Sequence, residues 1–214
     1  FPNILDKKFY QFTEALEFTL EGADSLSVLE GAALIDNQYV KWTGRTHYDA
    51  ETGANILYHS ASAFEVHFTG PEVKATLTAT NTSVNYKRPF IVIVLDDNFE
   101  NARTVELTKA ETEVTLAEGI EDDAEHKVTV YKRNESIDSH IGVKKIATTG
   151  VFIPKVEYRE RLIEFIAASS STGYGNLGAA DDGKTTANSD ALRAYAFLTA
   201  KALNADISIY AASG

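Results

Sequence analysis

Apolar and polar residues alternate strictly in two stretches near the middle of the chain, residues 64–68 and 73–79. Successive side chains of a strand point to opposite faces of a sheet, so this period of two predicts two half-buried strands. Thr69, Gly70 and Pro71 stand between the stretches, and these residue types favour turns. The pattern therefore predicts that the two strands form a β-hairpin.

Further short strands are predicted along the stretch from 38 to 154. Residues 90–95 are apolar throughout, as in a central strand buried on both faces, and weaker signals mark strands at 104–108, 113–117, 126–132 and 141–147. About nine or ten such strands with almost no helical signal favour a β-sandwich of jelly-roll type over a barrel. The core predicted between its sheets consists of Phe64, Val66, Phe68, Ile91, Ile93, Val128 and Val130.

The pattern changes after Pro154. Residues 162–166 predict a short apolar strand, a Ser/Gly-rich loop follows, and residues 207–210 predict a second strand. Between them a helix is predicted to begin at the capping residues 188–190 and to present one apolar face; that face comprises Leu192, Tyr195, Thr199 and Leu203. A strand, helix and strand in this order predict one parallel βαβ unit.

Three segments follow from these patterns. Residues 1–37 are an N-terminal segment of uncertain structure, in which 12–20 fit either a strand or one or two amphipathic turns. Residues 38–154 form the predicted β-sandwich, and 155–214 form the start of an α/β domain. The single βαβ unit has no further strands to complete a doubly wound sheet, so we expect the sequence to be incomplete.

Composition and charge narrow the classes of partner. Hydrophobic residues make up 44% and charged residues 24% of the 214 residues, as in an ordinary globular chain. Twenty Lys and Arg against 31 Asp and Glu give a net charge of -11, which repels phosphate backbones and anionic lipids, so we expect neither nucleic acid binding nor membrane insertion. The apolar runs are short and Phe1 follows no basic leader, so we expect a mature, soluble chain. Nothing in the sequence indicates an oligomeric state.

Few residues here are suited to holding a metal. The chain contains no cysteine, which excludes disulfides, thiolate ligands and thiol nucleophiles. Its five histidines, His47, His59, His67, His126 and His140, show none of the spacings typical of zinc ligands. We expect no metal and no cofactor.

The candidate chemistry lies after the two strands of the βαβ unit. Ligand sites of open α/β sheets lie beyond the carboxyl ends of the strands, which here are the loops after Ile166 and Tyr210. A serine at such a turn exposes its hydroxyl, and neighbouring N–H groups can hold an oxyanion. Hydroxyl-rich loops after strands are common, so spacing alone favours a purely structural loop.

The order of residues in this region resembles a known family. Ile163-Glu164-Phe165-Ile166, then Ser169, then Gly173-Tyr174-Gly175-Asn176 is similar to the first signature block of SGNH (GDSL-type) hydrolases, in the version of family 2 carbohydrate esterases. Ser213-Gly214 resembles the second block. The jelly roll that precedes the hydrolase domain in this family contains short recurring motifs, and three segments resemble them: Thr43-Gly44-Arg45, Phe68-Thr69-Gly70 and Val130-Tyr131-Lys132-Arg133. The resemblance covers about residues 38 to 214. It implies a jelly-roll β-sandwich followed by an SGNH-type doubly wound domain, of which only the first βαβ unit is present.

The resemblance also implies an activity. Family members remove O-acetyl groups from plant cell-wall polysaccharides such as acetylated xylan by means of a serine nucleophile. Carried over residue by residue, Ser169 is the nucleophile, the N–H groups of Ser169 and Gly214 form the oxyanion hole, and Tyr174 and Asn176 contact substrate. The expected partner is an acetylated polysaccharide or oligosaccharide, and the expected location is secreted, periplasmic or on a bacterial cell surface.

Two departures from the family pattern matter. Ala167-Ala168 stand where the family has Gly-Asp, and the later blocks, which supply an oxyanion asparagine and the general-base histidine, have no counterpart. All five histidines lie in the β-rich part, where none is placed to act as this base. Thirteen alanines lie between Ala167 and Gly214, so we also expect alanine to stand where the parent protein has other residues.

Two non-enzymatic functions remain as alternative hypotheses. One is a carbohydrate-binding protein that works through its sandwich, and the other is an adhesion or assembly module. Trp42 with Tyr39, Tyr48 and Tyr58 fits a sugar-stacking platform, although aromatic residues on a sandwich more often pack in its core or at its edges.

Overall fold

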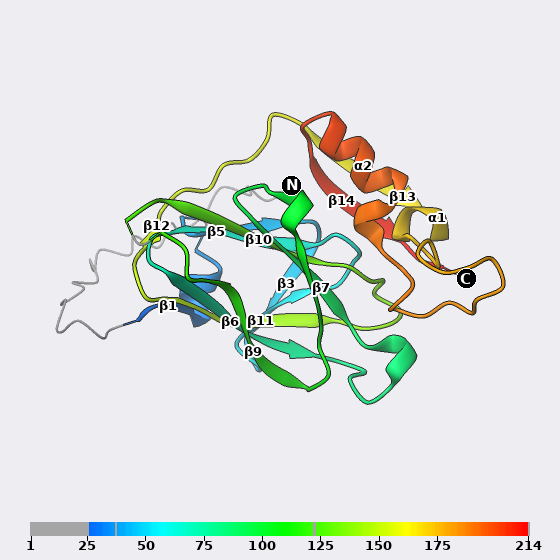
Figure 1. The fold of residues 1–214 in the computed structure, drawn as a ribbon, viewed down its shortest axis with the longest axis horizontal. Coiled ribbons are helices and arrows are strands. Elements are labelled where there is room, and N and C mark those ends of the chain that lie inside the picture. The colour runs from blue at the N-terminus through cyan, green and yellow to red at the C-terminus, as the bar shows by residue number, and fades with distance from the viewer. Residues whose placement is uncertain (1–25, 37, 122, 214) are drawn as a thin grey trace, which may run out of the picture.

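The computed structural model describes residues 26–36, 38–121 and 123–213 and consists mainly of two six-stranded antiparallel sheets that face each other (Figure 1). A smaller unit of two parallel strands and two short α-helices, yellow to red in Figure 1, packs beside them. The two facing sheets confirm the predicted sandwich, in the manner of a jelly-roll domain.

The strands of each sheet come from distant parts of the sequence. The first sheet has the order β3-β4-β11-β6-β9, with β1 also paired to β11. Its strands are β1 (Ser27–Glu30), β3 (Thr46–Asp49), β4 (Ala54–Leu57), β6 (Glu72–Ala79), β9 (Glu111–Glu118) and β11 (Ile141–Thr148).

The second sheet has the order β12-β5-β10-β7-β8, with β2 also paired to β5. Its strands are β2 (Val40–Thr43), β5 (Ala63–Phe68), β7 (Phe90–Leu95), β8 (Arg103–Glu106), β10 (His126–Lys132) and β12 (Phe152–Ile153). Single 3-10 turns lie between strands at η1 (Gly31–Leu34), η2 (Asn85–Lys87) and η3 (Phe99–Asn101).

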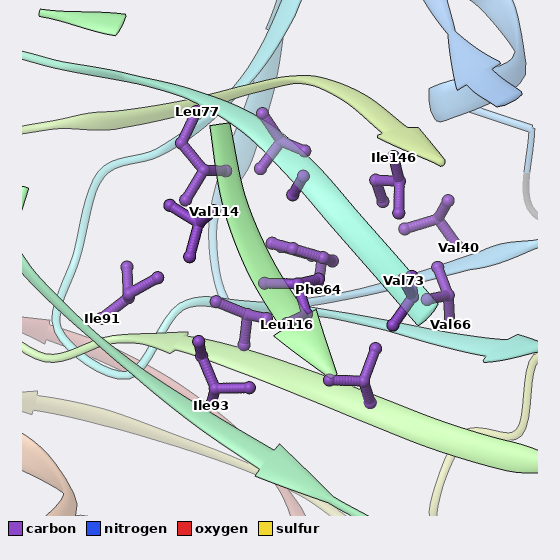
Figure 2. Close-up of a cluster of buried hydrophobic side chains, with 14 of the residues drawn as sticks. Val40, Phe64, Val66, Val73, Leu77, Ile91, Ile93, Val114, Leu116 and Ile146 are labelled. Atoms are coloured by element: carbon purple, nitrogen blue, oxygen red, sulfur yellow. The ribbon is translucent and has the colours of Figure 1, made fainter. Parts of the chain in front are cut away.

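The core lies between the sheets, where apolar side chains of both point toward one another (Figure 2). Phe64, Val66 and Phe68 of β5 are fully buried, and β10 places Val128 opposite Val66. All seven residues predicted for the core are buried, which confirms the register derived from their period-two spacing. His67, on the other face of β5, is also buried, and its Nδ1 lies 2.9 Å from a carboxylate oxygen of Glu125.

The predicted hairpin is wrong, because β5 and β6 belong to different sheets. The residues between them form a corner that crosses from one sheet to the other, and the chain crosses back beside it at Gly150. There the Thr69 N–H donates to the Val151 carbonyl at 2.9 Å. Gly70 has a φ of +97°, and a Cβ on it would lie 2.4 Å from the Gly150 nitrogen, so this close approach requires glycine.

β7 is apolar at every position because both of its faces are covered. It lies between β10 and β8, as expected of a central strand. Ile91 and Ile93 belong to the core between the sheets, whereas Val92 and Val94 belong to a second apolar cluster with residues of the α/β unit. The outer face of the second sheet is therefore the platform on which the α/β unit packs.

The α/β unit contains the predicted parallel strands. β13 (Leu162–Ala167) pairs with β14 (Asp206–Ala211) in a register that sets Ala167 beside Ala211. The connection between them contains α1 (Ser169–Thr172), the 3-10 turn η4 (Ala191–Arg193) and α2 (Tyr195–Ala202). Phe197 of α2 anchors the unit, since its ring lies 6.0 Å from the ring of Phe99 and 5.3 Å from that of Tyr131.

The predicted apolar face of the helix is wrong. Asp190 caps the 3-10 turn by accepting the N–H of Leu192, and Ala194 is extended before α2 begins, so the spacing counted from Leu192 does not continue into α2. Ala196, Phe197 and Ala200 are buried instead. Tyr195 and Leu203, which were predicted to be buried, are 50% and 47% exposed.

The described part of the N-terminal segment joins the sandwich. β1 pairs with β11, and Leu29 and Leu34 are buried in the sandwich core. Residues 12–20, for which strand and helix stay open, lie outside the described residues. No helix in the described part of the chain has the length and apolar character needed to cross a bilayer.

Candidate functional site

Ser169 lies at the carboxyl edge of the parallel strand pair. It is the first residue of α1 and follows β13 by a single residue, Ala168, whose backbone is extended. Ser213 follows β14 by a single residue as well, so both strands deliver a serine to the same edge. This is the edge predicted from the βαβ order. Gly214, the other residue assigned to the oxyanion hole, lies outside the described residues.

The serine-rich run divides into exposed and buried hydroxyls. Ser169 is half-buried and Ser170 is exposed, whereas Ser171 and Thr172 are fully buried. The Ser171 hydroxyl lies 2.7 Å from the Tyr195 hydroxyl and so ties α1 to α2. Thr172 donates its hydroxyl to the carbonyl of Ser169 at 2.8 Å. Two of the hydroxyls are therefore structural, which the composition of the run alone does not reveal.

A tight glycine turn ends α1. Gly173 has a φ of +72°, and a Cβ there would lie 2.1 Å from the carbonyl oxygen of Asp190. The Asp190 N–H donates to the carbonyl of Gly173 at 3.2 Å. Because only glycine permits this approach, the turn holds the Ser169 segment directly against Asp190, the residue before η4.

The two residues assigned to substrate contact have different surroundings. Tyr174 is 49% exposed, and the Lys184 ammonium lies 5.8 Å from the centre of its ring. The Asn176 amide is bonded to the backbone of Asp190 at both ends, donating to its carbonyl and accepting from its N–H at 2.9 Å each. That pair of bonds stabilises the loop. A contact of either residue with substrate stays a prediction.

The sandwich contributes residues to this edge that the motif did not identify as part of the site. Arg133 donates to the carbonyls of Thr186 and Ala187 at 2.7 and 2.8 Å, and the Asn134 amide donates to those of Thr186 and Ser189. Burial lowers the pKa of the Arg133 guanidinium and lowers that of the Lys132 ammonium to about 7. Lys132 and Arg133 end the segment Val130-Tyr131-Lys132-Arg133, which resembles a motif of the family. That resemblance is the sequence signal that could have identified them as residues near the site.

The outer face of β13 and β14 carries a polar patch against a sandwich loop. Arg45 donates to Glu164 at 2.9 Å, and Ser208 donates to the same carboxylate at 3.1 Å. The hydrogen bond from Arg45, followed by that from Ser208, holds the pKa of Glu164 below its usual value. The Arg45 guanidinium also lies 5.1 Å from the ring centre of Tyr210.

The five histidines all belong to sandwich strands or their loops, as the sequence indicated. The ring of His59 lies 5.1 Å from that of Tyr210 in the α/β unit, and burial lowers the pKa of His59. No hydrogen bond within the described residues joins a histidine to Ser169. Nor do three or more His, Cys, Asp and Glu side chains of the described chain gather in a way that could hold a metal ion.

The sandwich is also the part of the chain that a family model recognises. The model described as "Carbohydrate esterase 2 N-terminal" matches residues 42–154, more than half of the chain. These residues run from β2 to β12, so the match assigns the sandwich to the carbohydrate esterases. The chain belongs to carbohydrate esterase family 2.

Similar proteins extend the likeness beyond the sandwich. A cellulase/esterase, CelE of Acetivibrio thermocellus, is 27% identical over 181 residues, which cover 84% of this chain and 21% of the relative. The structure of an acetyl xylan esterase from Butyrivibrio proteoclasticus matches with a TM-score of 0.77 at 24% identity, over 88% of this chain and 49% of the other. A family 2 carbohydrate esterase of Clostridium thermocellum in complex with cellohexaose matches with a TM-score of 0.73 at 24% identity, over 82% and 51%. The chain thus spans about half the length of these matched structures.

Proposed function

We propose that this chain provides the nucleophile-bearing half of a carbohydrate esterase that removes O-acetyl groups from plant cell-wall polysaccharide. The observation that carries the proposal is the position of Ser169 at the start of α1, beside the carboxyl ends of both parallel strands, in a chain that belongs to carbohydrate esterase family 2. The acetyl xylan esterase among the similar structures supports this substrate class.

The proposed chemistry is acyl transfer. The Ser169 hydroxyl attacks the acetyl carbonyl, its proton passes to a general base, and the tetrahedral oxyanion is held by the N–H groups of Ser169 and Gly214. The sugar alcohol leaves, and water then releases acetate from the serine ester. Tyr174, half-exposed beside this edge, offers an aromatic face to the sugar. None of these steps requires a metal or a cofactor.

The general base must come from outside the sandwich histidines. A serine without a base is a poor nucleophile, and the five histidines belong to strands and loops of the sandwich. We therefore expect no acetate release from the 214-residue chain by itself and release from the complete gene product. A secreted, periplasmic or cell-surface location on a bacterium follows from this function, because acetylated polysaccharide lies outside the cell.

The test compares two neighbouring serines. Acetate release from acetylated xylan is measured for the complete gene product with Ser169→Ala and, as a matched control, with the exposed Ser170→Ala. We expect Ser169→Ala to abolish release while circular dichroism and the melting temperature stay unchanged, and Ser170→Ala to retain activity. Full activity of folded Ser169→Ala would rule out the proposed nucleophile.

A second candidate function is carbohydrate binding without catalysis. A cleft of about 550 Å³ lies at the opposite edge of the strand pair, between the second sheet and residues 157–161. Tyr158, which is 60% exposed, and the charged side chains of Lys41 and Arg159 line it. An aromatic face with polar groups around it is suited to a sugar ring. The similar structure with cellohexaose makes unacetylated glucan the first ligand to test.

Gel retardation in native gels containing soluble polysaccharide separates this candidate from the esterase. Binding in the cleft predicts retardation that Tyr158→Ala abolishes and Ser169→Ala leaves unchanged. Absence of retardation for the unmodified chain, on both cellulosic and xylan polymers, would eliminate the binding function.

A further inference from the structure

The connection between β10 and β11, residues 133–140, is unusual because its charged and amide side chains are buried. Arg133, Asn134, Glu135 and Asp138 are each at most 5% exposed, whereas Ile137 is 57% exposed. Connections normally run over the surface, because buried polar groups need partners. The partners of this connection lie largely in the α/β unit, at the edge that carries Ser169.

One branch of these contacts reaches the Ser169 turn. Asn134 holds the carbonyl of Ser189 at 3.0 Å, and the Ser189 hydroxyl accepts the N–H of Gly175 at 3.0 Å. The neighbouring Asp190 packs on Gly173, the residue that ends α1. The sandwich is thus linked to the helix that begins at Ser169 through two successive contacts.

The other branch reaches the end of β14. The Ser213 N–H donates to Oε2 of Glu135 at 2.6 Å. Glu135 itself is 1% exposed, and its Oε1 lies 3.4 Å from the Lys184 ammonium. Lys184 is shared with Asp138, whose carboxylate lies 2.5 Å from the same nitrogen. A buried carboxylate held in this way fixes the direction of the chain at Ser213.

We propose that Glu135, a residue of the sandwich, is a positioning residue for the esterase site, because its hydrogen bond to the Ser213 N–H aligns the end of β14 with the Ser169 turn. The inference rests on the proposed function, in which the next residue, Gly214, supplies an oxyanion donor. A donor of this kind stabilises the transition state only when it is held in place before the reaction. The sandwich would then be a working part of the catalytic site and not an appended module.

Two conservative variants distinguish the effect of the length of the Glu135 side chain from the effect of its charge. Glu135→Gln keeps an oxygen at the same reach but loses the charge that faces Lys184, whereas Glu135→Asp keeps the charge but withdraws the oxygen from Ser213 by one methylene. Asp138→Asn is the matched control, because Asp138 lies in the same connection as Glu135 and also contacts Lys184, but has no bond to Ser213.

The first measurement is amide hydrogen exchange at Ser213 in the 214-residue chain, followed by NMR. We expect Glu135→Asp to accelerate exchange at Ser213 at least about tenfold, as loss of a hydrogen bond to a charged group predicts. Glu135→Gln keeps a neutral acceptor in place and should accelerate exchange less, and Asp138→Asn should stay close to the unmodified chain. The reverse order, with Gln impaired and Asp normal, would show that Glu135 acts only as a buried charge and would overturn the proposal.

The second measurement is acetate release by the complete gene product. We expect Glu135→Asp to lower kcat by about 10 to 100-fold with KM unchanged, because a misplaced oxyanion donor affects the transition state more than substrate binding. Glu135→Gln should retain most of the kcat of the unmodified protein. Unchanged kcat in Glu135→Asp would overturn the positioning role. If the unmodified product releases no acetate, the proposed function fails, whereas the exchange measurement still decides whether Glu135 holds Ser213.

Discussion

The sandwich and the α/β unit bury their apolar surface in different ways. The sandwich places the inner faces of its two sheets against each other, so its core residues find their partners within the same domain. The α/β unit uses α2 and β14 to cover the outer face of the second sheet, while Leu162 and Ile166 of β13 are 69% and 76% exposed. The sandwich therefore has an internal source of stability, and the α/β unit derives much of its order from contacts with the sandwich.

The largest expected effect tests this contrast directly. Phe64→Ala removes a fully buried ring from the centre of the sandwich and should lower the free energy of unfolding by about 3–5 kcal/mol. Leu162→Ala, at an exposed position of β13, should change it by less than about 0.5 kcal/mol. Urea unfolding followed by circular dichroism measures both. Similar losses in the two variants would contradict the contrast.

A smaller loss is expected at the contact between the two regions. Phe197→Ala removes the ring that packs on Phe99 and Tyr131 and should lower the free energy of unfolding by about 2–3 kcal/mol. Hydrogen exchange should lose protection mainly in β13 and β14 and keep it in β5 and β10. Leu198→Ala, the exposed neighbour on α2, is the matched control. Uniform loss of protection across both regions would mean that they unfold as one unit.

Within the serine run, a buried hydroxyl should matter more for stability than the proposed nucleophile. Ser171→Ala breaks the bond to Tyr195 and should lower the free energy of unfolding by about 1 kcal/mol. The half-buried Ser169→Ala should change it by less than about 0.5 kcal/mol. Thermal melts of the two variants under identical conditions give the comparison, and the opposite order would assign Ser169 a structural role.

The smallest effect concerns pH at the contact of His59 with Tyr210. Burial is the main cause that lowers the pKa of His59 from its ordinary 6.5, so below that pH the unfolded chain binds a proton more readily than the folded one. His59 should therefore contribute to a loss of stability as the pH falls below about 6.5. Melting temperatures of His59→Gln between pH 5 and pH 8 should show a shallower fall than those of the unmodified chain. Parallel curves would remove His59 as a cause.

Periodicity predicted the strands well but not their partners. Residues 64–68 and 73–79 are both strands with the predicted faces buried, since alternation records which side of a strand meets apolar surroundings. Alternation contains no information on which strands pair with each other. The residues between these two strands form a corner between two sheets and not the expected hairpin. The predicted helix face was wrong for a related reason, because the pattern did not reveal that Ala194 is extended and that α2 begins only at Tyr195. The face that is buried meets the outer side of the second sheet, which the pattern within the helix does not record.

The candidate site was predicted in part. The strand order alone placed Ser169 and Ser213 at one edge, because adjacent parallel strands end on the same side of a sheet. The bond of Ser171 to Tyr195 and the bonds of Asn176 to Asp190 join residues distant in sequence, so these structural roles could not be predicted from the run itself.

Local periodicity and chain order, which act over a few residues, were enough to predict the two structural classes present, the inward face of the sandwich strands and the edge at which the serine lies. The packing of the two units was needed to reveal that a buried connection of the sandwich, through Asn134 and Glu135, holds both sides of that edge. Contacts between residues 134 and 189, or 135 and 213, arise from the packing of two separate units, and no pattern within either unit encodes the distance between them.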